Sequence, residues 1–230
     1  MGIYFRADTT RMSFRELWWL SSTIPVFLIA CVRKVFRLRA PITWAVRHDA
    51  TIAVLPTDKV PAHVLQALEP LVENFRRLGA HLAFYHTVPS SKNVEGCAAI
   101  LLPCERDAII VITWARASGR KGRVGCTITS RLYDGTLLST TNLVGSTGKP
   151  PGSQVLRWRN ATPAELSCRH REALAEAASR ATPVCDEEDA KEVLREGKRR
   201  KFEWNVSRGV YVPLTTAEQA QLGLSLEGNS

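Results

Sequence analysis

A run of 16 residues without a charged side chain, Leu17–Val32, constrains this chain more than any other feature of its sequence. Ser13 and Glu16 precede it with the S-x-x-E spacing of a helix capping box, so a hydrophobic helix is expected to begin there. Such a helix would be about 24 Å long, shorter than the roughly 30 Å hydrocarbon core of a bilayer. Pro25 lies near its middle and is expected to kink or break it. The segment therefore predicts a short spanning helix or a bent hairpin in one leaflet.

Four basic residues directly follow the apolar run, and they are Arg33, Lys34, Arg37 and Arg39. Cations at this position lie at the level of anionic headgroups and favour retention of the flank in the cytoplasm. We therefore expect residues 1–40 to form a membrane-associating segment and the domain that follows to be cytoplasmic.

Two other interpretations of Leu17–Val32 stay open. A 16-residue run lies below the usual spanning length, so it also fits a core helix of a soluble cytoplasmic protein. Residues 28–31 resemble the lipobox of bacterial lipoprotein signal peptides, with Cys31 as the acylated residue. The cations directly after Cys31 disfavour its translocation.

The composition is that of an ordinary globular protein, with 45% hydrophobic and 23% charged residues, and residues 41–230 are long enough for one domain with a substantial core. The six cysteines contain no C-x-x-C pair, which argues against a zinc ribbon or a thioredoxin-type site. We expect mostly buried, reduced thiols, or a Cys97–Cys104 disulfide if the domain is exported.

The net charge of +9 is unevenly distributed along the chain. Residues 1–40 carry a net +5, residues 41–160 a net +6, and residues 161–230 a net −2. Nucleic acid, anionic lipid and acidic proteins are all partners that a basic surface favours.

The pattern predicts an α+β fold, in which an antiparallel meander of four to five strands packs with a helix and C-terminal helices follow. Pro61–Leu78 has helical apolar spacing and is followed by Gly79. The expected strands are 81–86, 98–102, 108–114, 124–132 and 136–142, and Asp134-Gly135 predicts a type I′ hairpin turn between the last two.

The rest of the chain predicts a loop over residues 143–161 and a mostly helical part over residues 162–230. Helices are expected over 162–180 and 186–200, then an extended segment over 202–212 and a last short helix that begins at Thr215.

A glycine-punctuated basic loop between two expected strands is the main candidate contact for phosphate oxygens, and its cations are Arg116, Arg120, Lys121 and Arg123. A solvated hairpin loop is the alternative interpretation. A second basic cluster, Lys198–Lys201, precedes Phe202 and Trp204, as in some nucleic-acid or membrane contacts, but cations at a helix end also complement the helix dipole.

Catalytic and cofactor motifs fail on spacing. Gly145–Lys149 lacks the P-loop spacing, and Pro150 stands where its hydroxyl is required. Cys168 and His170 are two apart on a helix, so they are not expected to meet, and we interpret them as a core cysteine and a surface histidine. No metal or cofactor is expected.

The sequence thus favours a non-enzymatic, membrane-associated domain that contacts anionic lipid or an acidic protein through the two basic segments. The alternatives are a soluble nucleic-acid-binding protein and an enzyme, a hydrolase or transferase, whose site is assembled from distant residues. A pocket that joins two or more of five side chains would favour the enzyme, and they are His81, His86, Cys126, Asp134 and His170.

Overall fold

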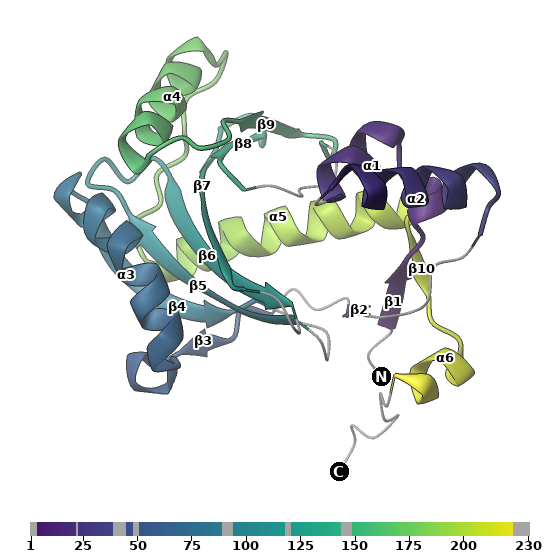
Figure 1. The fold of residues 1–230 in the computed structure, drawn as a ribbon. Helices are drawn as coiled ribbons and strands as arrows, with labels where there is room; N and C mark the ends of the chain where they lie inside the picture. Colours follow the sequence, from purple (N-terminus) through teal and green to yellow (C-terminus); the bar gives the residue numbers. More distant parts are fainter. Residues whose placement is uncertain are drawn as a thin grey trace.

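The computed structural model describes residues 4–21, 23–38, 45–47, 51–88, 94–117, 121–143 and 149–222. Within them the fold is α+β, with a seven-stranded mixed sheet, a three-stranded sheet and six α-helices (Figure 1). The predicted fold class is confirmed, but the expected meander of four to five strands is wrong as a description of the whole sheet.

The large sheet keeps its strands in sequence order, β3-β4-β5-β6-β7-β8-β9. Its strands are β3 (Val54–Leu55), β4 (His81–Thr87), β5 (Val94–Leu102), β6 (Ile109–Ala117), β7 (Arg123–Arg131), β8 (Leu137–Thr141) and β9 (Ser153–Arg157). The predicted antiparallel strands correspond to β4–β8. The sequence missed β9, which pairs in parallel with β8 and lies in the predicted loop. Its short stretch of five residues becomes a strand because the edge of β8 is available to it.

The β7–β8 hairpin forms at the predicted position, but its turn is not type I′. Only Gly135 of the two central residues has a positive φ, +82°. The Gly135 amide donates to the carbonyl of Leu132, and the Asp134 carboxylate accepts a hydrogen bond from the amide of Thr136. The side-chain bond stabilises a wider turn, so Asp134 keeps an ordinary φ.

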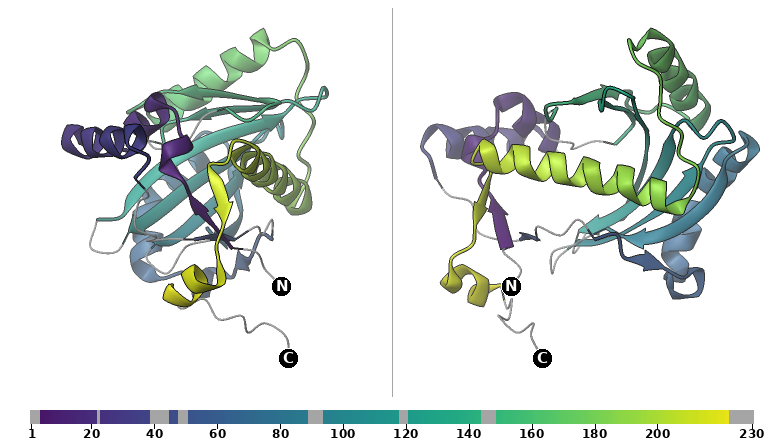
Figure 2. Two further views of the ribbon diagram at one scale, coloured as in Figure 1. Left: turned by 90° about the vertical axis from the view of Figure 1, so that its right-hand side faces the viewer. Right: turned by 180° about the vertical axis from the view of Figure 1, so that it is seen from behind.

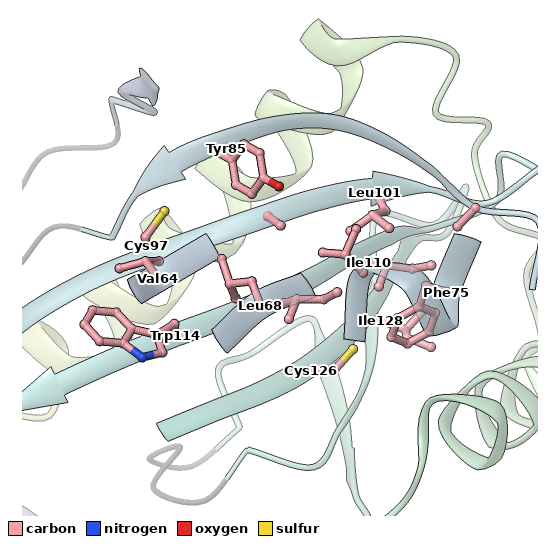
Figure 3. Close-up of a cluster of buried hydrophobic side chains, with 14 of the residues drawn as sticks. Val64, Leu68, Phe75, Tyr85, Cys97, Leu101, Ile110, Trp114, Cys126 and Ile128 are labelled. Carbon is pink, nitrogen blue, oxygen red and sulfur yellow. The ribbon is translucent and has the colours of Figure 1, made fainter. Parts of the chain in front are cut away.

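Helices α3 (Ala62–Arg77) and α4 (Pro163–Glu176) cover one face of the sheet. Leu68, Val72 and Phe75 of α3 have no exposed surface and pack on apolar side chains of β4–β7, including Tyr85, Ile110 and Ile128 (Figure 3). The helical stripe predicted over Pro61–Leu78 is thus a core face.

Helix α5 (Glu187–Ser207) crosses the opposite, concave face of the sheet (Figure 2). Arg200 anchors it by donating to the carbonyls of Gly135 and Gly152. The helix runs to Ser207, so its predicted end at residue 200 is wrong. Residues beyond 200 stay helical because Asn205 is buried and Phe202 makes aromatic contacts, and only β10 (Tyr211–Pro213) is extended.

Segments from the first and last parts of the described chain pair in the small sheet, whose order is β10-β1-β2. Its central strand β1 (Tyr4–Ala7) pairs antiparallel with β10 and with β2 (Val46–Arg47). The last helix, α6 (Thr216–Gln221), begins at the predicted Thr215 with a complete capping box.

The apolar run does not form the one hydrophobic helix that the sequence predicted. It divides into α1 (Phe14–Leu20) and α2 (Ile24–Val35). Pro25 lies in the first turn of α2, where backbone N–H groups have no partner within the helix, so proline costs no hydrogen bond there. No helix in the described ranges combines the length and the apolar character that crossing a membrane requires.

An ion pair joins α1 to the end of α5. Glu16, only 6% exposed, accepts hydrogen bonds from both terminal nitrogens of Arg208 at 2.8 and 2.7 Å. The predicted capping box is also present, since the Glu16 carboxylate accepts from the Ser13 amide. Burial by itself raises the pKa of Glu16, but the bonds from Arg208 and Ser13 outweigh it and lower the pKa to about 2.

We expect Glu16→Gln to reduce the free energy of unfolding by about 3 kcal/mol at pH 7, because Arg208 loses its buried counter-ion. The wild-type contribution is complete above the unfolded pKa, 4.5, and is lost as the pH falls towards 2. Urea unfolding at pH 7 and pH 3 measures both effects.

The matched control is Glu165→Gln, which alters the same capping-box motif on the surface of α4. It should cause a much smaller change. Equal losses in the two variants would contradict the importance of the ion pair to Arg208.

Candidate functional site

The outward face of α2 carries large apolar side chains that the rest of the described chain leaves exposed. Exposure ranges from 45% at Val26 to 65% at Val35. The set consists of Ile24, Val26, Leu28, Ile29, Val32 and Val35. Contiguous apolar surface of this kind marks an interaction site more often than single scattered residues do.

The inward face of α2 packs on the rest of the protein and includes a hydrogen bond from Lys34. Phe27 and Ala30 pack on a small core made by Met12, Leu17 and Val210. The ammonium group of Lys34 donates to the carbonyl of Thr10 at 2.9 Å. Helix α2 thus reverses the usual arrangement of a surface helix, since a cation faces the protein and aliphatic side chains face outward.

The chain after α2 extends this apolar surface. The amide of Leu38 donates to the carbonyl of Arg33, and Arg37 has a φ of +52°, the geometry of a helix C-terminal cap. Phe36 and Leu38 remain 69% and 53% exposed on either side of Arg37.

A basic cleft of about 470 Å³ is lined by side chains from η1 (Thr9–Arg11), α1, α2, β9 and the end of α5. It is lined by Arg11, Met12, Ser13, Arg15, Glu16, Lys34, Lys149, Arg157, Trp204 and Arg208. Six of these residues are cationic and one is acidic. Since that acid, Glu16, is already bonded to Arg208, the cleft favours an anionic occupant.

Like charges crowd the inner side of the basic cleft. Burial, and then the charge of Arg15, lower the pKa of the Arg157 guanidinium. Burial, and then the charge of Arg157, likewise lower the pKa of Lys201. The charge of Arg157 is thus opposed by Arg15 within the cleft and by Lys201, which does not line it. An anion in the cleft would relieve the repulsion between Arg15 and Arg157.

A second hollow of about 480 Å³ connects the cleft with the apolar helix. It shares Arg11 and Lys34 with the basic cleft. Its other lining residues are Asp8, Thr10, Phe14, Val35 at the end of α2, and Arg37 just after it. Charged and apolar surfaces are therefore continuous here.

The structure divides the residues predicted from the first basic segment. Lys34 lines both hollows and Arg37 lines the second. Arg33 lies on α2 but lines neither. Arg39 falls outside the described residues.

The predicted basic loop does not contribute to the basic cleft. Arg116 forms an ion pair with Glu95 at 2.7 Å and lies over the ring of Trp114. Lys121 and Arg123 are exposed, and Arg120 lies outside the described residues. The loop is at the β6–β7 end of the sheet, and none of its described cations lines either hollow.

Most of the cleft was missed by the sequence reasoning. Arg11, Arg15, Lys149, Arg157 and Arg208 were not predicted as site residues. They come from three separate parts of the chain, and no local motif links them. The excess of positive charge in residues 1–40 was the available signal.

The buried histidine of α4 reverses a prediction. His170 is 3% exposed, whereas Cys168 is exposed, so the expected surface histidine and core cysteine are exchanged. The Ser130 hydroxyl donates to the carbonyl of Asp107 and lies 2.9 Å from His170 Nε2, while Thr140 lies 3.0 Å from Nδ1. Because the Ser130 hydroxyl donates its only proton to the Asp107 carbonyl, it accepts a hydrogen bond from Nε2–H of His170. The hydrogen bond between Ser130 and His170 therefore has a structural role.

The five side chains that the enzyme hypothesis would bring together are absent from both hollows described above. His86 and Cys126 are buried, and His81 and Asp134 are exposed. Among the described residues, no three His, Cys, Asp or Glu side chains gather as metal ligands.

The cysteines also differ from expectation. All six are free, and only Cys97 and Cys126 are buried. Cys104 lies at the surface and donates its thiol hydrogen to the carbonyl of Gly79, so the structure contains no Cys97–Cys104 disulfide.

We expect acid to destabilise the fold through His86 and His170. Burial is the main cause that lowers the pKa of each to about 4. The unfolded chain binds these protons near pH 6.5, so each neutral histidine contributes about 3 kcal/mol that is lost as the pH falls from 6.5 to 4. Proton NMR titration of the imidazoles measures both pKa values, and a value near 6.5 for His170 would contradict its burial as a neutral group.

No model of a known protein family, no curated protein and no solved structure matches this chain.

Proposed function

We propose that this protein is a non-enzymatic domain that binds the surface of anionic membranes through α2. The carrying observation is the continuity of its exposed apolar face with the basic cleft through the second hollow. On this proposal the helix lies in the interface plane and the cations contact phosphate-bearing headgroups. The cytoplasmic leaflet, which carries anionic lipid, is the expected location.

The apolar side chains supply the first part of the binding energy. Burying a Leu, Ile or Val side chain completely is worth about 1.5–3 kcal/mol, and α2 offers six such residues that are already about half exposed or more. An interfacial helix inserts its apolar face about 5–10 Å into the boundary of headgroups and acyl chains. The short length of α2 is therefore no obstacle to this binding mode.

The cations supply the second part. Each Lys or Arg near an anionic leaflet contributes about 1 kcal/mol. Arg15, Arg37 and Lys149 are exposed around the two hollows. An apolar face gives no advantage in binding a phosphate backbone alone, so the combination favours lipid over nucleic acid.

Deleting residues 1–40 is a poor test of this proposal. It removes β1 from the centre of the small sheet and Leu17 from a core in which it is 2% exposed. Exposed point substitutions separate membrane binding from folding.

We expect the full chain to bind vesicles of phosphatidylglycerol and phosphatidylcholine, and to bind pure phosphatidylcholine much more weakly. Combining Leu28→Gln, Ile29→Gln and Val32→Gln should reduce binding about 100-fold or more, because three apolar side chains no longer enter the interface. Combining Arg15→Gln, Arg37→Gln and Lys149→Gln should reduce it on the order of 100-fold at low salt. Vesicle co-sedimentation measures all of these.

The control for charge combines Lys59→Gln, Arg77→Gln and Arg171→Gln, which removes three exposed cations from η2 (Thr57–Lys59), α3 and α4. It should bind like the wild type. If both charge variants lost vesicle binding equally, the net charge of the protein, and not the position of the cations, would explain the binding. Unchanged binding in the apolar variant, or tighter binding to duplex DNA than to vesicles, would overturn the proposal.

A further inference from the structure

We propose that the basic cleft is a specific site for a phosphate-bearing anion with more than one negative charge. This deepens the proposed function and rests on it for the source of the ligand, a lipid headgroup that carries a phosphate monoester. A free phosphate compound has the same recognised chemistry.

The charge of the cleft requires such a ligand. Its lining contains six cations and one carboxylate, and Arg208 already neutralises that carboxylate with two hydrogen bonds. Four further cations in the lining carry the argument, and they are Arg11, Arg15, Lys34 and Lys149. A singly charged group would balance only one of these four charges.

The side chains are also of the type that recognises phosphate. Arg11 and Arg15 contribute guanidinium groups to the lining, and the planar donors of a guanidinium can bind two oxygens of one phosphate. Burial, and then the charge of Arg15, lower the pKa of Arg157, which lines the same cleft. One multiply charged group in the cleft would be attracted by all of these cations.

Contacts within the protein position several side chains of the cleft. Arg208 lies 4.1 Å from the centre of the Trp204 ring and is bonded to Glu16, so its guanidinium is held in place from two sides. Lys34 is positioned by its bond to Thr10. A volume of about 470 Å³ lies in the usual range for small-molecule sites, roughly 300–1,000 Å³, which suits one headgroup or one small anion.

The first experiment titrates the full chain with inorganic pyrophosphate by isothermal calorimetry. We expect binding to one site, with at least tenfold weaker affinity when Arg15→Gln and Lys149→Gln are combined. Arg15→Lys, which keeps the charge but loses the planar donors, should also weaken binding. The matched control, Lys59→Gln with Arg77→Gln, should bind like the wild type.

The second experiment identifies the source of the phosphate. Vesicles that contain phosphatidic acid, a phosphate monoester, are compared with vesicles of phosphatidylserine at matched surface potential. We expect preferential binding to phosphatidic acid, competition by pyrophosphate, and loss of that preference in the Arg15→Gln, Lys149→Gln variant. The apolar variant of α2 should lose vesicle binding but keep its affinity for pyrophosphate.

Failure of this inference and failure of the proposed function give different results. Vesicle binding without pyrophosphate binding, or pyrophosphate binding that the cleft substitutions leave unchanged, overturns the phosphate site and leaves the proposed function standing. Cleft-dependent pyrophosphate binding without vesicle binding supports the phosphate site, assigns it to a free phosphate compound and overturns the membrane proposal.

Discussion

The ion pair between Glu16 and Arg208 is the interaction on which the arrangement of α1, α2 and the basic cleft depends. It joins residues 192 positions apart and holds α1 against the end of α5. Helix α2 contacts η1 (Thr9–Arg11) and α1, so its position follows from theirs. The same pair forms one wall of the basic cleft and consumes its only carboxylate. One ion pair therefore both holds α1 in place and leaves the basic cleft without an unpaired carboxylate.

Helix α2 owes its character to the direction in which its side chains point. A composition of aliphatic residues and a basic end fits both a core helix and an anchor, but the structure buries Phe27 and positions Lys34 inward while Leu28 and Ile29 stay exposed. Helix α2 is held by the packing of Phe27 and Ala30 and by its contacts with α1. Helix α1 is itself fixed by its capping box and by the ion pair of Glu16 with Arg208.

The large sheet and its helices provide a scaffold whose charged and polar interior groups serve stability. Arg200 is bonded to two backbone carbonyls, and His170 bonds the hydroxyls of β7 and β8 across the sheet. Arg200 and His170, which the sequence offered as partner-contact and chemical candidates, are thus used for structure, and neither lines the described hollows.

The sequence by itself determined the local structure: the helix over Pro61–Leu78, five antiparallel strands, and the capping boxes at Ser13 and Thr215. These follow from apolar period and hydrogen bonds between near neighbours, which a sequence displays directly. Only the tertiary structure decided which face of α2 is exposed, that α5 continues past residue 200, and that Arg15, Lys149 and Arg157 converge. The physical reason is that the convergence of charge depends on contacts between residues more than 100 positions apart, and the exposed face of α2 depends on its packing against η1 and α1. Neither kind of contact has a local spacing in the sequence.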